Sequence, residues 1–267
     1  MSNTKFPTFF ISHGGGPWPY IDDMKKQFAK TARELSQLPE SLPCKPKAIL
    51  VITGHWEESE FTVSTATDPP MRYDYSGFPE HTYRIKYLAP GSPTLASRVR
   101  ELLGQAGISS KEDPHQGFDH GTFVPLFLMY PDASIPVVML SLKSNYNPLE
   151  HFRAGQALTP LRNEGILIIG SGLTYHNMRG FGQTDATPVS EQFELYLNEA
   201  ISDPNPVSRA EKLINWETAP VARLAHPRED HLIPLMVVVG AAGDDVGRRV
   251  FVDKVFNVAM ASYRFGD

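Results

Sequence analysis

The sequence predicts a single three-layer α/β domain over residues 1–267, in which helices cover both sides of a central, mostly parallel or mixed sheet. Two observations carry this prediction: short apolar runs rich in β-branched residues, and segments of helical periodicity that alternate with them. The apolar runs are spread from end to end. With 41% hydrophobic and 21% charged residues, the composition is that of a globular protein and excludes a disordered chain.

Four apolar runs predict buried strands. Residues 9–12 end shortly before three consecutive glycines, and residues 48–53 end at Gly54. Residues 135–142 and 165–170 are rich in Val, Ile and Leu without alternation, so both of their faces must be covered. We expect these strands to form the centre of the sheet.

Segments of helical periodicity lie between and after these strands. The expected helices span residues 21–35, 92–105, 148–162, 191–201 and 209–216. Ser92 is the expected N-cap of the second helix, because its hydroxyl can accept a hydrogen bond from the first turn. Residues 122–129 form a further apolar, helix-like segment, and residues 250–263 are expected to form a closing strand with flanking turns.

A Pro-, Gly- and Tyr-rich stretch at residues 68–93 shows no clear periodicity. Loops of this length in compact domains are usually functional or disordered. Its aromatic side chains favour an ordered loop that packs over another part of the molecule; they are Tyr73, Tyr75, Phe78, Tyr83 and Tyr87.

Charge and hydropathy exclude several classes of partner. The net charge is −5 with a pI near 6.0, and no cluster of Lys and Arg suggests a nucleic-acid surface. The longest apolar stretches, such as residues 49–53 and 237–242, fall far short of the roughly 20 residues that cross a bilayer. Residues 1–5 lack a secretory pattern, so we expect a cytoplasmic protein.

Cys44 is the only cysteine, which excludes an intramolecular disulfide and a thiolate zinc cage. Any metal must therefore be held by His, Asp or Glu side chains.

Histidines follow several of the predicted strands. His13 and His55 each come directly after a strand, His176 follows the strand at 165–170 by a few residues, and His120 opens the segment at 122–129. A single histidine beside a strand is usually structural, but several at corresponding strand ends can meet at one edge of the sheet, where α/β proteins bind ligands. This arrangement predicts a metal site.

A second histidine cluster contains His226 and His231, with Glu229 and Asp230 between them. One of these residues could complete a metal site begun by His13. We assign the three remaining histidines to solvated or locally hydrogen-bonded positions; they are His81, His115 and His151.

The segment that begins at His13, with the sequence His-Gly-Gly-Gly, also resembles the oxyanion-hole segment of lipases and esterases. That fold needs a G-x-S-x-G nucleophile elbow. The nearest candidate surrounds Ser171 and has Ile169 and Leu173 where the outer glycines should be, which disfavours a serine hydrolase. Phosphate-binding motifs of the P-loop and Rossmann types are absent from the sequence, as is H-E-x-x-H.

Several motifs in a fixed order carry a family resemblance over nearly the whole chain. They are Ser12-His13-Gly14, Gly54-His55-Trp56, Tyr73-Asp74-Tyr75-Ser76-Gly77-Phe78-Pro79, Ala89-Pro90-Gly91-Ser92-Pro93, Gly117-Phe118-Asp119-His120-Gly121, Ser171-Gly172 through His176-Asn177, and Glu229-Asp230-His231-Leu232. With these motifs the chain resembles the LigB-type, class III extradiol ring-cleavage dioxygenases, in the branch that includes DOPA 4,5-dioxygenases. The fold that this family implies agrees with the fold predicted from the residues.

The resemblance implies that His13, His55 and His231 bind a metal, while His176 and His120 face the substrate as acid/base and oxygen-contacting groups. Many extradiol enzymes use two histidines and one carboxylate, so Glu229, Asp230 and His176 remain open as further contacts of the metal. The implied cofactor is Fe(II), and Zn(II) can occupy such a site in purified protein.

A facial set of three protein ligands on Fe(II) leaves positions open for a catechol and O2, the implied small-molecule partners. His176 would accept a proton from the diol and later return one, a task that suits an imidazole. A DOPA-like substrate would also need a cation for its carboxylate; the candidates are Arg72, Arg84, Lys86 and Arg179.

Two alternatives remain open on the sequence. A zinc-dependent hydrolase could use the same histidines, with water as the nucleophile. A non-catalytic binding protein could have kept the fold, although that alternative predicts damage to the histidine set, and all the motif histidines are present.

Overall fold

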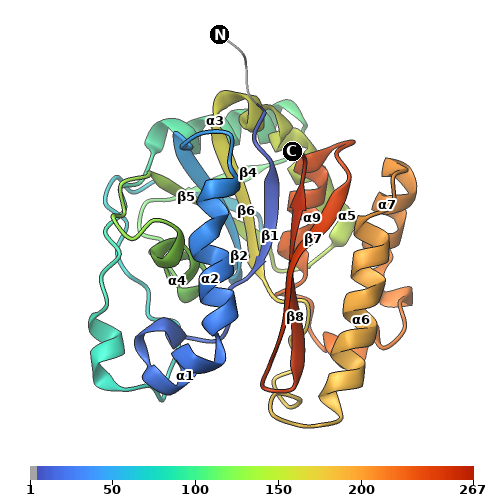
Figure 1. The fold of residues 1–267 in the computed structure, drawn as a ribbon. Coiled ribbons are helices and arrows are strands. Elements are labelled where there is room, and N and C mark those ends of the chain that lie inside the picture. The colour runs from blue at the N-terminus through green and yellow to red at the C-terminus, as the bar shows by residue number, and fades with distance from the viewer. Residues whose placement is uncertain (1–4) are drawn as a thin grey trace.

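The computed structural model describes residues 5–267, and within them one eight-stranded sheet forms the centre of a single α/β domain (Figure 1). The strands are β1 (Thr8–Ser12), β2 (Ala48–Glu58), β3 (Phe61–Ser64), β4 (Ser110–Asp113), β5 (Val137–Lys143), β6 (Ile166–Gly172), β7 (Gly247–Val255) and β8 (Val258–Phe265). They lie in the order β4-β3-β5-β2-β6-β1-β8-β7. The pairs β1–β6, β2–β6, β2–β5 and β3–β4 are parallel, whereas β3–β5, β1–β8 and β7–β8 are antiparallel.

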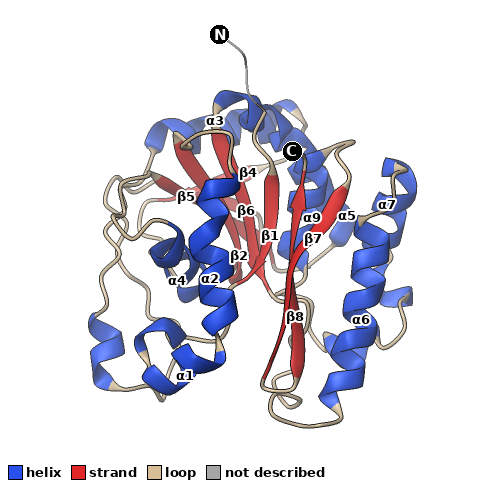
Figure 2. Cartoon of the chain, viewed as in Figure 1, coloured by secondary structure: helices blue, strands red, loops and turns tan. Residues whose placement is uncertain are grey.

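Helices cover both faces of this sheet, as Figures 1 and 2 show. They are α1 (Asp22–Gln27), α2 (Ala29–Gln37), α3 (Pro93–Gln105), α4 (His120–Met129), α5 (Pro148–Leu158), α6 (Ala186–Ile201), α7 (Pro206–Ile214), α8 (Ala222–Ala225) and α9 (Ile233–Ala242). On one face α9 packs against β1, β2 and β6 and is itself covered by α5. On the other face α4 packs against β2 and β6, and α2 packs against α4. The predicted three-layer fold is confirmed.

All four predicted central strands are present, with shifted ends. β1 and β6 are buried along their whole length, as expected for strands covered on both faces. β2 runs past the predicted end at residue 53 to Glu58, so His55 lies within the strand and not after it. The pairing of β2 with β5 shifts between Ile52 and Glu57, and such irregularities re-aim side chains next to binding sites.

The predicted helices differ from the structure mainly at their ends. α3 matches residues 92–105, and the Ser92 hydroxyl accepts a hydrogen bond from the Leu95 backbone N–H at 3.2 Å. The helix predicted at 21–35 is divided into α1 and α2 at Phe28, which has φ −96° and ψ 18°. The helix predicted at 148–162 ends at Leu158, and a 3-10 turn (Thr159–Glu164) follows.

The closing strand predicted at 250–263 is wrong, because that segment folds as the antiparallel hairpin of β7 and β8. Its turn consists of Phe256 and Asn257, with φ of 50° and 63°. Positive φ at both central residues defines a type I′ hairpin turn, but the sequence lacks the glycine that usually marks one. No helix was predicted at α9, since a helix that is apolar on every side shows no amphipathic period.

The segment at residues 68–93 is an ordered loop that packs against the rest of the domain, as predicted. It contains a 3-10 turn (Glu80–Arg84) and a bridge between Met71 and Phe118. The Tyr73 hydroxyl donates a hydrogen bond to the Ile85 carbonyl, and the Tyr75 hydroxyl donates to the Thr82 carbonyl, each at 2.6 Å.

Among residues 5–267, the structure contains no helix that combines the length and the apolar character needed to span a membrane.

Candidate metal centre and active site

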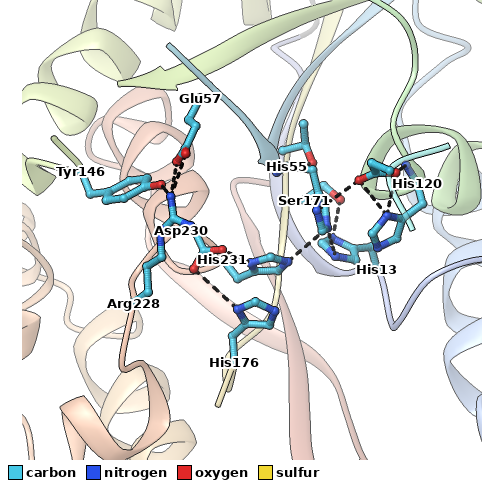
Figure 3. Close-up of polar contacts among 12 residues, drawn as sticks. His13, His55, Glu57, His120, Tyr146, Ser171, His176, Arg228, Asp230 and His231 are labelled. Carbon is cyan, nitrogen blue, oxygen red and sulfur yellow. Dashed lines mark hydrogen bonds and ion pairs between the residues drawn. The ribbon is translucent and has the colours of Figure 1, made fainter. Parts of the chain in front are cut away.

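Three chain segments bring His13, His55 and His231 together (Figure 3). β2, β6 and β1 are neighbours and run parallel, so their carboxyl ends lie at one edge of the sheet. His13 directly follows β1, and His55 lies near the end of β2. His231 precedes α9, and its carbonyl accepts a hydrogen bond from the backbone N–H of Leu173, just after β6, at 3.1 Å.

The Nε2 atoms of these three histidines converge. Nε2 of His55 lies 3.1 Å from Nε2 of His13 and 3.1 Å from Nε2 of His231. Two imidazole nitrogens that bind one metal ion at right angles, each about 2.1 Å from it, lie about 3.0 Å apart. The observed spacing therefore fits histidines that share one ion.

Polar contacts at Nδ1 orient each ring. Nδ1 of His13 lies 3.0 Å from the Ser171 hydroxyl, which donates its own proton to the Gly121 carbonyl and so must accept from His13. Nδ1 of His231 lies 2.9 Å from an Asp230 oxygen, and Nδ1 of His55 lies 3.2 Å from an Asp74 oxygen. With the proton on Nδ1 in all three rings, the Nε2 lone pairs face one another.

The local electrostatics keep these rings uncharged. Burial, and then the neighbouring histidines, hold the pKa of His13 and of His55 well below the usual value of 6.5. The same burial lowers the pKa of His231 to about 4, although Asp230 opposes the shift. Three neutral donors with facing lone pairs repel one another unless a cation lies between them, so the residues present fit a divalent metal.

Two carboxylates support the cluster from behind. Burial alone would raise the pKa of Asp230. The contacts of this carboxylate with His176 and His231 outweigh the effect of burial and hold the pKa below the usual range of an aspartate. Burial likewise opposes ionisation of Asp74, and hydrogen bonds from His120 lower its pKa overall. Both groups are therefore anionic and stabilise the Nδ1–H tautomers, as is usual behind metal-binding histidines.

His120 and His176 flank the three converging rings. His120 is the first residue of α4, and its Nδ1 lies 2.9 Å from both oxygens of Asp74. Nδ1 of His176 lies 3.5 Å from Asp230. Both rings, together with those of His55 and His231, line a cavity of 360 Å³, here called the site cavity.

The five histidines, together with Asp230, form two adjacent groups of possible ligands that share no residue. Donor atoms of His13, His55 and His120 lie within 4.8 Å of one another, and so do those of the set His176, Asp230 and His231. His55 touches both groups through its contact with His231. The histidines predicted from the sequence as ligands and as catalytic groups thus form one continuous cluster.

Glycines allow this close approach of backbone and rings. A Cβ on Gly121 would lie 2.4 Å from the Thr53 hydroxyl and 2.9 Å from the His55 ring. A Cβ on Gly172 would lie 2.0 Å from the His231 carbonyl. At Gly14, φ is +79°, and a Cβ would meet the Trp18 ring, whose N–H donates to the His13 carbonyl at 2.8 Å.

Other candidate residues lie outside the cluster. His226 is buried against Phe193 and Trp216. Glu229 pairs with Arg223 at 2.6 Å, so Asp230 is the carboxylate of that segment which supports the site. His81 and His115 are exposed, as expected for residues outside the site. His151 is buried, and its ring is hydrogen-bonded to the backbone of Lys143 and Asn147, as expected for a structural residue.

Two site residues have roles that the sequence analysis did not assign. Ser171 is buried within β6 and bonded to His13 and Gly121, so it supports a histidine and has no place in a nucleophile elbow. Asp74 belongs to one of the family motifs, but no role in the site was predicted for it. A lone acidic residue between two tyrosines in a non-periodic loop was the only available signal.

Comparison with known proteins decides the family. Residues 7–264 match the family described as the catalytic LigB subunit of aromatic ring-opening dioxygenase. The chain belongs to the LigB family. This LigB-family protein is 43% identical over 244 residues to the 4,5-DOPA dioxygenase extradiol of Beta vulgaris, a match that covers 89% of this chain and 87% of that one. It is 35% identical to the protein of the same name from Escherichia coli K12, over 90% of this chain and 87% of the other.

Two further relatives extend the comparison. The LigB-family protein is 35% identical to the dioxygenase tasH of Hapsidospora irregularis, over 97% of this chain and 85% of that protein. The crystal structure of an uncharacterized protein from Escherichia coli K12 matches with a TM-score of 0.79 at 30% identity, covering 98% of this chain and 100% of that chain. The family resemblance drawn from the motifs is confirmed, and the chain is a member of an extradiol aromatic ring-opening dioxygenase family.

Proposed function

We propose that this LigB-family protein is a non-haem Fe(II)-dependent extradiol dioxygenase that opens catechol-type rings with O2, and that His13, His55 and His231 hold the metal. The observation that carries the proposal is the convergence of three Nε2 lone pairs, each with its Nδ1 engaged behind it. Three neutral imidazoles on one side of an ion leave its other side free for substrate.

When bound, the metal supplies a Lewis acid that lowers the pKa of the catechol hydroxyls and brings the diol and O2 together. The remaining steps belong to the chain's own residues. His176 lines the cavity with Nδ1 directed at anionic Asp230, so its Nε2 is free to take a proton from the diol and return it later.

His120 is held by Asp74 in the same way, and its ring lines the site cavity as a hydrogen-bond donor to a substrate oxygen. We propose that this donor stabilises negative charge that develops on oxygen during ring opening. The site cavity, at 360 Å³, has room for a single aromatic ring with a substituent.

The names of the relatives in Beta vulgaris and Escherichia coli make L-DOPA the first catechol to try. We further propose that the protein acts in the cytoplasm, where its exposed free thiol, Cys44, would stay reduced.

The test is reconstitution with Fe(II) under anaerobic conditions, followed by addition of catechols in air. We expect uptake of one O2 for each ring opened, with a yellow product. Parallel samples loaded with Zn(II) should be inactive, because zinc has no redox chemistry. If catechols are untouched with Fe(II) while ester or amide substrates are cleaved with Zn(II), a zinc hydrolase replaces this proposal.

A further inference from the structure

Apart from the histidines and Tyr75, the wall of the site cavity is apolar, and the Tyr75 hydroxyl already donates a hydrogen bond to the Thr82 carbonyl at 2.6 Å. Aromatic and thioether side chains from α1, from the loop at residues 68–93, from the segment after β6 and from β8 surround it; they include Met24, Phe28, Phe78, Phe181 and Met260. Leu173 and the three consecutive glycines also line it. A substrate ring whose diol lies at the histidines would therefore place its substituent among hydrocarbon groups.

Among the described residues, 5–267, no Lys, Arg, Asp or Glu side chain lines this cavity. The four basic residues that the sequence offered as partners for a substrate carboxylate lie outside this lining. Arg72 donates a hydrogen bond to Gln116 at 3.0 Å, and Arg84 pairs with Glu80. Lys86 and Arg179 are exposed and do not line the cavity, although Arg179 follows Met178, which does.

The rim of the cavity is apolar as well. Met178, after β6, is 70% exposed, and Phe256, in the turn of the β7–β8 hairpin, is 40% exposed, yet both line the cavity. The Phe256 ring contacts Phe28 edge to face at 5.9 Å, and Phe28 in turn stacks on Trp18 at 4.8 Å. The apolar surface thus continues from the buried wall to the opening.

We infer that the site selects catechols whose ring substituent is uncharged and apolar, and that it disfavours the amino-acid side chain of DOPA. This inference rests on the proposed function, because it assumes that the diol lies at the histidines. A carboxylate or ammonium group in the cavity would lose its hydration without gaining a partner, which is costly, whereas an alkyl group gains contact with the wall. Both kinds of substrate carry the same diol, so any difference in their binding or turnover comes from the substituent.

The experiment compares substrates that share a three-carbon side chain and differ in charge: 4-propylcatechol, 3-(3,4-dihydroxyphenyl)propionate and L-DOPA. Values of kcat/KM are measured by O2 uptake with the Fe(II)-loaded enzyme. Dissociation constants are measured by calorimetry without O2. We expect kcat/KM for 4-propylcatechol to exceed that of either charged catechol by about tenfold or more, with the same order in affinity.

A cation placed at the rim should change this preference. In Met178→Arg, the new guanidinium lies beside the substituent, so kcat/KM for the propionate should rise relative to that for 4-propylcatechol. Met178→Gln is the matched control, since it is polar and of similar length but carries no charge. Because the Met178 side chain is exposed, both variants should fold normally, and circular dichroism checks this point.

The inference is overturned if kcat/KM and affinity for the propionate or for L-DOPA equal or exceed those for 4-propylcatechol. Loss of L-DOPA turnover in Arg179→Gln would also overturn it, because a cation outside the described wall would then hold the carboxylate. If no catechol is opened, the proposed function fails; the anaerobic binding order of the three ligands still decides the inference.

Discussion

The imidazole of His176 stacks on that of His231, with ring centroids 3.4 Å apart and planes inclined by 20°. Asp230 contacts both rings, at 2.9 Å from Nδ1 of His231 and 3.5 Å from Nδ1 of His176. One carboxylate therefore positions a proposed metal ligand and the proposed acid/base group together. We propose that this shared contact holds the acid/base ring close to the metal ligands.

Replacing His176 with Ala should lower kcat by about 10²- to 10⁴-fold, the usual contribution of a general acid/base group, while metal binding persists. Oxygen uptake measures turnover, and metal analysis after dialysis measures occupancy. His115→Ala is the matched control, since His115 is exposed and outside the cluster. Full activity in His176→Ala would contradict its role, and loss of the metal would show that it is a ligand.

The choice between His231 and His120 as the third ligand can be tested by replacing each with Ala. We expect His231→Ala to lose the metal, because its Nε2 lies 3.1 Å from that of His55. His120→Ala should retain the metal and lose turnover. Calorimetric titration of the metal-free variants with Fe(II) or Zn(II) checks this, and the reverse pattern would assign the metal to His13, His55 and His120.

Gly121→Ala should weaken metal binding although it alters no ligand. The added Cβ would lie 2.9 Å from the His55 ring and 2.4 Å from the Thr53 hydroxyl, so that the His55 segment must move. We expect a loss of affinity of about tenfold or more, as for other disturbances behind a metal ligand. Gly104→Ala is the control, since a Cβ there meets no atom within 4 Å. Equal affinity in the two variants would show that the site tolerates the displacement.

His151 predicts a pH dependence of stability that does not involve the metal. Its Nδ1–H donates to the Asn147 carbonyl at 2.7 Å, and its Nε2 accepts from the Lys143 backbone N–H at 3.0 Å. Burial lowers its pKa from 6.5 to about 4, so the unfolded chain binds a proton before the folded one does. Above pH 6.5 the ring is neutral in both the folded and the unfolded chain, so it costs no stability. As the pH falls from 6.5 towards 4, the unfolded chain takes up the proton first, and the free energy of unfolding decreases.

His151 should lower the free energy of unfolding by about 2 to 3 kcal/mol over this range. Urea unfolding of the metal-free protein at about pH 7.5 and about pH 4.5 measures it, with His151→Gln as the comparison. The variant should lose less stability than the natural protein between the two pH values. An identical loss in both would mean that His151 is protonated in the folded state without penalty.

The central sheet could be predicted from the sequence because buried parallel strands are marked by continuous apolar runs, as in β6. The hairpin of β7 and β8 could not, since its turn at Phe256 and Asn257 adopts positive φ without a glycine. The apolar helix α9 was not assigned for a related reason: it lacks any polar face. Local patterns thus fail where tertiary packing determines the conformation.

The same limit applies to the site. His13, His55 and His231 were identifiable because their motifs occur in a known order, and the structure brings their Nε2 atoms together. The partners behind them depend on contacts between distant segments: Ser171 is 158 residues from His13, and Asp74 is 46 residues from His120. No spacing in the sequence reveals such pairs.

The most direct test of the proposed function is a single turnover of the Fe(II)-loaded enzyme with a catechol and ¹⁸O2, with mass spectrometry of the product. The sample is quenched into a reductant that traps the new aldehyde before its oxygen exchanges with water. Extradiol cleavage predicts that both atoms of O2 enter the ring-opened product, one in a carboxylate and one at the former aldehyde carbon. Ring-opened product that carries oxygen from water alone, or an intact ring with O2 unconsumed, would contradict it.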